Sequence, residues 1–521
     1  MIVLKIREKL RRKVAAFTAS LALPTGFASR RQAQKKYFSR QNLLLYPRNP
    51  WLRRLKRGNP EITNYLDDLN HPMMTKNLLL LLFLLVSIAS FGQVSESTFD
   101  ATMEAVYAPN GPGGTAIIVQ DGKVLYHKGF GKASLELDVD MQAGHVFRIG
   151  SITKQFTAAA ILKLAEAGKL SLEDPITKFI PDYPTHDHTI TVHHLLNHTS
   201  GIKSYTGMEK WDAEARKRDF TPLELVDYFK DEPMDFAPGE EYRYNNSGYF
   251  LLGYIIQKAS GQPYDAYLRE TFFEPLGMKH TAYGHNSPIV EGRVAGYQPS
   301  PFGGYQNADY LSMTQPYAAG SLLSNVEDLS TWYHAVAADK VISAASRQLA
   351  HTPTTLNDGE VQQYGYGWSL GEQEGSAFWG HGGGINGFTT ASRYFPEEKL
   401  FVAVFSNCNC NDPGAVASKL ALQALGKYKE IKVISLSDDL LDKYEGKFEL
   451  NPSLILTVTK KDGQLSVHAT GQGSVMIEAY EEHKFFNEAL NAKIHFNFAD
   501  DGSVESLTLL QGGEYVCKRI E

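Results

Sequence analysis

Two side chains in one short stretch have the types and the spacing that nucleophilic catalysis needs. Ser151 and Lys154 stand three positions apart in Gly150-Ser151-Ile152-Thr153-Lys154. On a helix these positions share a face, with Cβ atoms ~5–6 Å apart, so the amine can take the hydroxyl proton once burial and nearby cations lower its pKa. A serine at the helix start would also direct backbone N–H groups and the positive end of the helix dipole toward developing negative charge. The stretch predicts a serine nucleophile with a lysine base.

The same spacing recurs at Ser200 and Lys203. Average composition gives roughly two such pairs by chance in a chain of this length, so context must separate them. Ser151 opens an apolar-periodic stretch that predicts a helix capped by Ser151, running to about Ala167 and ended by Gly168. Ser200 instead lies in a His-Thr-Ser-Gly turn. We therefore expect the chemistry at Ser151 and Lys154.

A second candidate is the triplet Tyr244-Asn245-Asn246. A tyrosine held near cations can act as a general base, and a neighbouring asparagine amide can orient a substrate carbonyl. Tyr305-Gln306-Asn307 has the same form, so the triplet alone is not specific. Tyr244 and Asn246 become candidates because they follow Ser151 and Lys154 in the sequence.

A glycine-rich segment, His381-Gly382-Gly383-Gly384, is the third candidate. It precedes a predicted strand at Thr389–Phe395, and its small residues would let a substrate backbone approach the strand edge. We expect the N–H of Gly384 to pair with that of Ser151 as an oxyanion hole. His127-Lys128-Gly129 has the same His-x-Gly form and shows that this pattern is also weak by itself.

The elements that must position these residues are β-rich at both ends of one region and helical between. Asp121-Gly122 predicts the turn of a hairpin over 114–131. An apolar strand at 400–405 follows the strand at 389–395, and 415–425 predicts a closing helix. Residues from about 175 to 330 predict helices with long loops. This order indicates a sheet completed late in the chain, with an inserted helical subdomain.

A separate, small, all-β domain is expected from about 435 to 521. Residues 454–458 and 465–467 predict strands around a turn at Asp462-Gly463, and 494–498 alternates with period two before Asp501-Gly502 and a strand at 504–510. The segment contains no recognisable catalytic constellation.

Taken in order, Ser-x-x-Lys, Tyr-x-Asn and His-x-Gly resemble the serine β-lactamase and penicillin-binding-protein superfamily, most of all its branch of class C β-lactamases, D,D-carboxypeptidases and related esterases. The flanking stretches that support the resemblance are Phe147–Ser151, Leu195–Gly201, Pro238-Gly239, Ala318–Ser321, Gly365–Trp368 and Gly380–Phe388.

The resemblance covers about residues 99–425 and implies an α+β fold for a hydrolase domain at 93–430. In this fold an antiparallel sheet flanked by helices stands beside an all-helical subdomain, with the active site between them. It implies that Ser151 is the acylated nucleophile, that Lys154 and Tyr244 transfer protons, and that Asn246 contacts substrate. The domain at 435–521 resembles lipocalin-like modules that follow such hydrolases.

One departure bears on the substrate. Related β-lactamases carry Lys-Thr-Gly or Lys-Ser-Gly at the third motif, whereas here His381 replaces the cation and Gly382 lacks the hydroxyl. A carboxylate left without these partners costs ~1–3 kcal/mol per unpaired group, so we favour peptidase, amidase or esterase activity over β-lactam hydrolysis. A titratable His381 also predicts a change of activity between pH ~5 and 8. The expected substrates are small molecules, peptides or esters, including cell-wall peptides, with no cofactor.

Three other interpretations compete with this one. The histidines at 186, 188, 193, 194 and 198 form a tempting cluster, but no His-Glu-x-x-His accompanies them and we expect no metal site. His-Gly-Gly-Gly is also typical of α/β-hydrolase lipases, which require a Gly-x-Ser-x-Gly downstream of it, and none follows residue 384 in this sequence. A sensor that is acylated at Ser151 with little turnover, or a binding protein that does not react, remains an alternative.

The N-terminal region differs from the rest in charge. Residues 1–72 carry an excess of basic residues, whereas the 521-residue chain has a formal charge of −6. Met73-Met74-Thr75-Lys76-Asn77 precedes an apolar run and small residues, which predicts a signal peptide at 73–92. The run is too short to span a membrane as a helix. We expect 1–72 to be a misassigned extension, the alternative being a basic arm that binds nucleic acid or anionic lipid.

The expected mature chain, from residue 93, is strongly acidic and secreted or periplasmic. Its surplus of Asp and Glu argues against a nucleic-acid partner. The chain has three cysteines, too few for a disulfide framework. Cys408 and Cys410 are one residue apart, a poor disulfide geometry within a strand, so we interpret them as structural.

Overall fold

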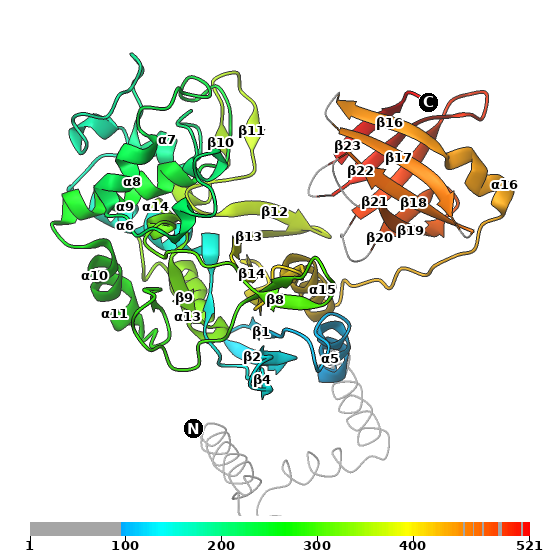
Figure 1. The fold of residues 1–521 in the computed structure, drawn as a ribbon, viewed down its shortest axis with the longest axis horizontal. Helices are drawn as coiled ribbons and strands as arrows, with labels where there is room; N and C mark the ends of the chain where they lie inside the picture. Colours follow the sequence, from blue (N-terminus) through cyan, green and yellow to red (C-terminus); the bar gives the residue numbers. More distant parts are fainter. Residues whose placement is uncertain (1–94, 452–453, 462, 471–473, 488–491, 512–513) are drawn as a thin grey trace, which may run out of the picture. The chain divides into compact units, whose positions relative to one another are not determined.

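The computed structural model describes residues 95–451, 454–461, 463–470, 474–487, 492–511 and 514–521 (Figure 1). The predicted extension at 1–72 and the predicted signal peptide at 73–92 lie outside the described residues.

A six-stranded antiparallel sheet forms the centre of the region before residue 430. Its strand order is β12-β13-β14-β15-β1-β2, so the first strands of the domain pair with the last. The strands are β1 (Gly114–Gln120), β2 (Lys123–Phe130), β12 (Ser369–Gln373), β13 (Ser376–Ile385), β14 (Phe388–Phe395) and β15 (Leu400–Ser406). The hairpin predicted around Asp121-Gly122 and the late completion of the sheet are confirmed.

Both faces of this sheet are buried, because its central strands alternate between two hydrophobic cores. Ile118 and Val404 face α5 (Glu96–Glu104) and α15 (Pro413–Ala424), whereas Ile117 and Ala403 face the opposite core with α13 (Val326–Ala337). Continuous apolar strands are typical of a sheet covered on both sides. The sheet is therefore a rigid support for the residues along its strands and edges.

The helices of the inserted region share the second core with the sheet. They are α6 (Thr153–Glu166), α7 (Val192–Leu196), α8 (Pro222–Phe229), α9 (Asn246–Ser260), α10 (Tyr264–Leu268), α11 (Glu274–Leu276), α12 (Tyr317–Gly320) and α14 (Ala344–Ala350). Short strands connect them: β3 (Lys132–Ser134), β4 (Val139–Asp140), β5 (Phe147–Arg148), β6 (Ala282–Tyr283), β7 (Tyr297–Pro299), β8 (Tyr305–Asn307), β9 (Leu322–Ser324), β10 (Thr354–Thr355) and β11 (Val361–Gln362). The predicted α+β fold with a helical subdomain is confirmed.

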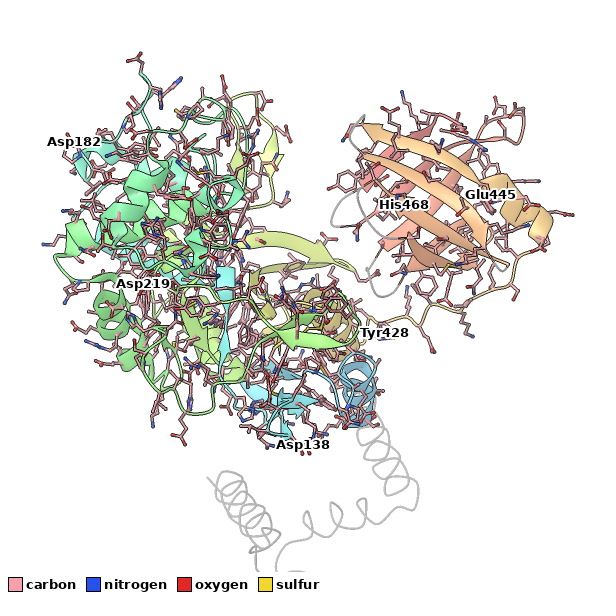
Figure 2. All side chains as sticks on the ribbon, in the orientation of Figure 1. Asp138, Asp182, Asp219, Tyr428, Glu445 and His468 are labelled. Atoms are coloured by element: carbon pink, nitrogen blue, oxygen red, sulfur yellow. A yellow bond between two sulfur atoms is a disulfide. The ribbon has the colours of Figure 1, made fainter. Side chains whose placement is uncertain are left out.

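The C-terminal part is a closed antiparallel barrel after the short helix α16 (Asp438–Leu441). Its strands are β16 (Gly446–Asn451), β17 (Leu454–Lys461), β18 (Gln464–Ala469), β19 (Ser474–Glu481), β20 (Lys484–Asn487), β21 (Ala492–Phe498), β22 (Val504–Leu510) and β23 (Glu514–Arg519). Buried aromatic side chains, among them Tyr444 and Phe496, pack in its core. In Figure 2, Glu445 marks the residue before β16 and His468 lies on β18. The small all-β module is confirmed.

One expectation about the cysteines is wrong. Cys408 and Cys410 form a disulfide. They lie beyond the end of β15 in a turn rather than inside a strand, so their side chains need not diverge and can meet. The carbonyl of Cys408 also accepts a hydrogen bond from the Thr389 hydroxyl, 3.0 Å away, which fastens the turn to β14.

Across the part of the chain that the structure describes, no helix combines the length and the apolar character needed to cross a bilayer.

Candidate active site

Ser151 lies just before a helix rather than capping it. The structure places it in a 3-10 turn at Gly150–Ile152, and α6 begins at Thr153 with no side-chain cap, so the predicted capping role is wrong. Gly150 has φ +50°, and a Cβ there would come within 2.9 Å of the Gly384 nitrogen. Only glycine allows this close approach. The turn leaves the Ser151 hydroxyl available to other partners.

Lys154 is fully buried beside Ser151. Its Nζ lies 3.1 Å from the Ser151 Oγ, 2.9 Å from the Asn246 Oδ1 and 2.9 Å from the Ala319 carbonyl oxygen. Burial holds the pKa of the Lys154 amine well below its usual range. A neutral amine that donates to the amide and carbonyl oxygens, which only accept, keeps its lone pair for the Ser151 proton. The geometry suits a lysine that acts as a base.

Tyr244 covers the other side of this amine. The Lys154 Nζ lies 4.7 Å from the centre of the Tyr244 ring. The residue is 38% exposed as a whole, but its hydroxyl end is packed in protein. That burial raises the pKa of the Tyr244 hydroxyl, and the nearby Ser151 side chain offsets the rise only in part. Tyr244 is therefore protonated at neutral pH, so it suits a proton donor better than the general base expected from the sequence.

Asn246 is the first residue of α9, whose start is capped by Asn245. The Asn245 Oδ1 accepts a hydrogen bond from the Gly248 N–H at 2.8 Å. The Asn246 amide is occupied on both sides, because its Oδ1 accepts from Lys154 and its Nδ2 donates to the Thr206 Oγ1, 3.1 Å away. In this structure Asn246 orients the lysine rather than presenting a free amide.

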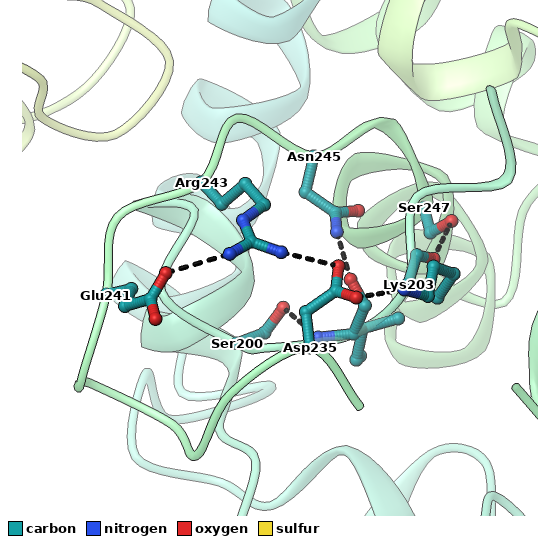
Figure 3. A network of polar contacts seen from close by, with 8 residues as sticks. Ser200, Lys203, Asp235, Glu241, Arg243, Asn245 and Ser247 are labelled. Atoms are coloured by element: carbon teal, nitrogen blue, oxygen red, sulfur yellow. Dashed lines mark hydrogen bonds and ion pairs between the residues drawn. The ribbon is translucent and has the colours of Figure 1, made fainter. Parts of the chain in front are cut away.

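Contacts with the loop that contains Ile202 and Lys203 hold Tyr244-Asn245-Asn246 in place at the start of α9 (Figure 3). The Asn245 Nδ2 donates to the Ile202 carbonyl, and the Ser247 hydroxyl donates to the Lys203 carbonyl at 2.8 Å. The Asp235 carboxylate pairs with Lys203 and, at 3.2 Å, with Arg243. Lys203, the lysine of the second Ser-x-x-Lys, is thus neutralised by a carboxylate, whereas Lys154 forms no ion pair with a carboxylate of the described residues.

The glycine-rich segment belongs to strand β13, and Gly384 faces its free edge. A two-residue turn lies at each end of β13. Gln373 pairs with Ser376 across the turn before the strand, and Ile385 pairs with Phe388 across the turn after it. Alternation along an antiparallel strand then directs the N–H of Gly384 away from β14. Pairing with β12 stops at Gly380, so this edge is open beside the turn of Ser151. Gly384 lies against Gly150, the residue before Ser151, as the predicted pairing of Gly384 with Ser151 requires.

The three glycines differ in the space around them. A Cβ on Gly383 would lie 2.0 Å from the Ile149 carbonyl oxygen, so this residue must be glycine for β13 to pack on the turn. A Cβ on Gly382 would meet only the Thr390 carbonyl oxygen, at 3.5 Å, and one on Gly384 would project into open space. Gly383 is structural, whereas Gly382 and Gly384 border room for a ligand.

His381 is a buried neutral residue. Its Nε2 lies 3.0 Å from the Tyr364 hydroxyl, and its Nδ1 lies 2.5 Å from the Gly382 carbonyl oxygen. Burial, above all, lowers the pKa of His381 to about 4. The expected change of charge between pH ~5 and 8 is therefore wrong for this residue. His381 supplies no permanent cation for a substrate carboxylate.

Of the clustered histidines, one enters the site, and it was not among the predicted site residues. The His198 ring centre lies 4.3 Å from that of Tyr244. His193 instead contacts the Tyr366 hydroxyl, and His194 contacts the backbone at the start of α7. Within the described residues no group of three or more His, Cys, Asp or Glu side chains is placed to hold a metal ion. The one available signal for His198 was its His-Thr-Ser-Gly turn, which belongs to the superfamily resemblance.

A serine–lysine pair on a turn, a tyrosine beside it and an open glycine-rich strand edge define a serine acyl-transfer site between a sheet and a helical subdomain. The family model described as Beta-lactamase matches residues 97–426, and the chain belongs to this family. A second model, described as a domain of unknown function (DUF3471), matches residues 431–516.

Individual relatives agree with this assignment. Penicillin-binding protein 4* of Bacillus subtilis is 28% identical over 429 residues, which cover 77% of this chain and 93% of that protein. The structure of the octameric penicillin-binding protein homologue from Pyrococcus abyssi has a TM-score of 0.59 and 28% identity, and the match covers 81% of this chain and 99% of that one. A D-stereospecific amidohydrolase from Streptomyces sp. has a TM-score of 0.56 and 26% identity, over 64% of this chain and 100% of that one.

Proposed function

We propose that this protein is a serine hydrolase that forms an acyl-enzyme at Ser151 and cleaves amide or ester bonds in small D-amino acid derivatives or peptides. The observation that carries the proposal is the 3.1 Å contact between the Ser151 Oγ and an amine, that of Lys154, whose pKa is lowered by burial. An uncharged amine in contact with a hydroxyl is what activates a serine without a histidine.

Acylation uses the two proton carriers on either side of Ser151. The Lys154 amine takes the hydroxyl proton as the Ser151 Oγ attacks the substrate carbonyl carbon. The N–H groups of Gly384 and Ser151 stabilise the resulting oxyanion. The Tyr244 hydroxyl gives its proton to the leaving nitrogen or oxygen as that bond breaks, and the Lys154 ammonium returns a proton to Tyr244. The products of this half-reaction are an ester on Ser151 and a free amine or alcohol.

Deacylation uses Lys154 and Ser151 again, with water as the attacking group. Water loses a proton to the Lys154 amine as its oxygen attacks the ester carbonyl, and the Ser151 Oγ regains a proton when its bond to the acyl carbon breaks. A carboxylic acid leaves, and both Ser151 and Lys154 return to their starting protonation states. No other co-reactant is needed.

The third motif supports substrates that are neutral at the end beyond the cleaved bond. His381 is uncharged above pH ~5, and Gly382 has no hydroxyl, so a substrate carboxylate would lose its solvation without gaining partners. Amides and esters carry no such charge. The similarity to a D-stereospecific amidohydrolase supports D-configured amides as the first class to test.

We also propose that the protein is exported. The support is the predicted signal peptide at 73–92, together with the acidic composition of the chain after it. Mass spectrometry of the native protein tests this: an N-terminus near residue 93 supports export, whereas peptides from 1–72 contradict it.

The proposed activity is tested with the chain from residue 93, supplied with D-amino acid amides, D-Ala-D-Ala peptides, short esters and a chromogenic cephalosporin. We expect turnover of amides or esters, and loss of turnover and of labelling by a fluorescent penicillin in Ser151→Ala. Ser200→Ala, which changes the serine of the second Ser-x-x-Lys, is the matched control. Full activity of Ser151→Ala would refute the assignment, and a stable adduct without product release would indicate the sensor.

A further inference from the structure

His198 contacts the segment that carries Tyr244 at three points. Its backbone carbonyl accepts a hydrogen bond from the Arg243 N–H at 3.0 Å, and its ring Nδ1 accepts one from the Asn245 N–H at 3.1 Å. Its ring also packs on the intervening Tyr244 ring, 4.3 Å between centres. One residue thus fixes the backbone on both sides of the proton donor and the donor's own ring.

The hydrogen bonds determine the state of the His198 ring. Because Nδ1 accepts from a backbone N–H, the neutral ring carries its proton on Nε2. Nε2 is buried and has no hydrogen-bond partner among the described residues. Burial, above all, keeps the pKa of His198 well below its usual range. The ring is therefore a neutral acceptor rather than a proton carrier.

The backbone of His198 is also specialised. Its φ is +65°, in the left-handed region that non-glycine residues adopt only uncommonly. The residue is 1% exposed. This conformation places its carbonyl and its ring on the same neighbouring segment, and a buried position in a strained region is typical of functional sites.

We infer that His198 is a positioning residue for the hydrolysis, which uses its Nδ1 to hold Asn245, and through it Tyr244, in reach of Ser151. The inference rests on the proposed function and adds a residue to it. Asn246 follows Asn245 directly and contacts Lys154. The contact of His198 with Asn245 therefore also fixes the position of Lys154, the second proton carrier, relative to Tyr244. A displacement of about 1 Å in such a group can cost on the order of 100-fold in rate.

Two substitutions separate the Nδ1 contact from the backbone conformation. His198→Asn keeps an acceptor near the Nδ1 position and tolerates the left-handed φ, whereas His198→Gly tolerates the φ and has no acceptor. We expect kcat to fall about 10-fold or more in His198→Gly with KM nearly unchanged, and to stay within about 3-fold of wild type in His198→Asn. Should His198→Gly not fold, His198→Ala provides the variant without an acceptor.

Crystal structures of both variants give a readout that does not depend on activity. The inference predicts that Tyr244 moves away from Ser151 in the glycine variant and stays in place in the asparagine variant. Equal rate losses in both variants, or an unmoved Tyr244 in His198→Gly, would overturn it. If the wild-type protein neither turns over substrates nor labels at Ser151, the proposed function fails, and the two structures still decide whether His198 positions Tyr244.

Discussion

The Lys154 Nζ lies 2.9 Å from the Asn246 Oδ1, although 92 residues separate the two in sequence. This contact joins α6, which carries the proposed base, to the start of α9, which follows the proposed proton donor. Because the Asn246 amide is held in turn by Thr206, the contact also ties the amine to the loop before α8. The proton carriers are thus set by the packing of two helices and one loop.

Replacing Lys154 with arginine should remove the base and put a permanent cation in its place. Guanidinium groups stay protonated in proteins, so Lys154→Arg cannot take the Ser151 proton, and we expect acylation to slow by about 10²–10⁴-fold. The measurement is the rate of Ser151 labelling by a chromogenic ester. Lys163→Arg, on the same helix but exposed and paired with Glu166, is the matched control. Equal rates for the two variants would rule out Lys154 as the base.

The pH dependence of acylation should follow Lys154 and not His381. Protonation of the amine on acidification removes the base, so the rate constant should rise with pH until Lys154 is neutral. With a pKa of about 4, His381 stays neutral from pH 5 to 8. We therefore expect His381→Asn to leave the shape of the profile across this range unchanged, whatever its effect on absolute rate. A limb between pH 5 and 8 that disappears in the variant would contradict this assignment.

Adding a hydroxyl at Gly382 should shift preference toward substrates with a carboxylate. A Cβ there meets only ordinary contact, so Gly382→Ser should fold, and one new hydrogen bond of about 1 kcal/mol corresponds to roughly a 5-fold gain in kcat/KM for a cephalosporin relative to a neutral ester. Gly383→Ser is the contrasting variant. Its Cβ would clash with the Ile149 carbonyl, so it should lose activity toward both substrates. A Gly382→Ser variant with an unchanged ratio would refute the missing-hydroxyl argument.

His351 should make the fold sensitive to acid. The residue is half-buried, but its ring packs on Trp379, with ring centres 4.4 Å apart, and desolvation of the ring lowers its pKa to about 3. Between about pH 3 and 6.5 the unfolded chain binds a proton that the folded chain does not, so stability rises with pH by up to about 1.4 kcal/mol per pH unit from this group. His351→Phe keeps an aromatic ring and should reduce that slope, as measured by urea unfolding between pH 4 and 7. An unchanged slope would show that other groups dominate.

Local patterns were sufficient for much of the fold because they act within one element or one turn. Asp121-Gly122 predicted its hairpin, and the apolar run at 400–405 predicted its strand. The helix after Ser151 was predicted to within two residues at its start. The difference arises because a helix start is chosen among neighbouring residues by tertiary contacts, here the close approach of Gly150 to Gly384.

The sequence by itself determined the family, the order of the elements and most of the candidate residues at the site, though not His198, since motif order and periodicity are properties of the chain. Only the tertiary structure decided their electrostatic states: burial lowers the pKa of the Lys154 amine, keeps Tyr244 protonated and holds His381 neutral. It also decided which of the two lysines is neutralised, because the tertiary structure brings the Asp235 carboxylate to Lys203. The pKa of a side chain and its partners depend on the atoms packed around it, and segments far apart in the sequence supply most of those atoms.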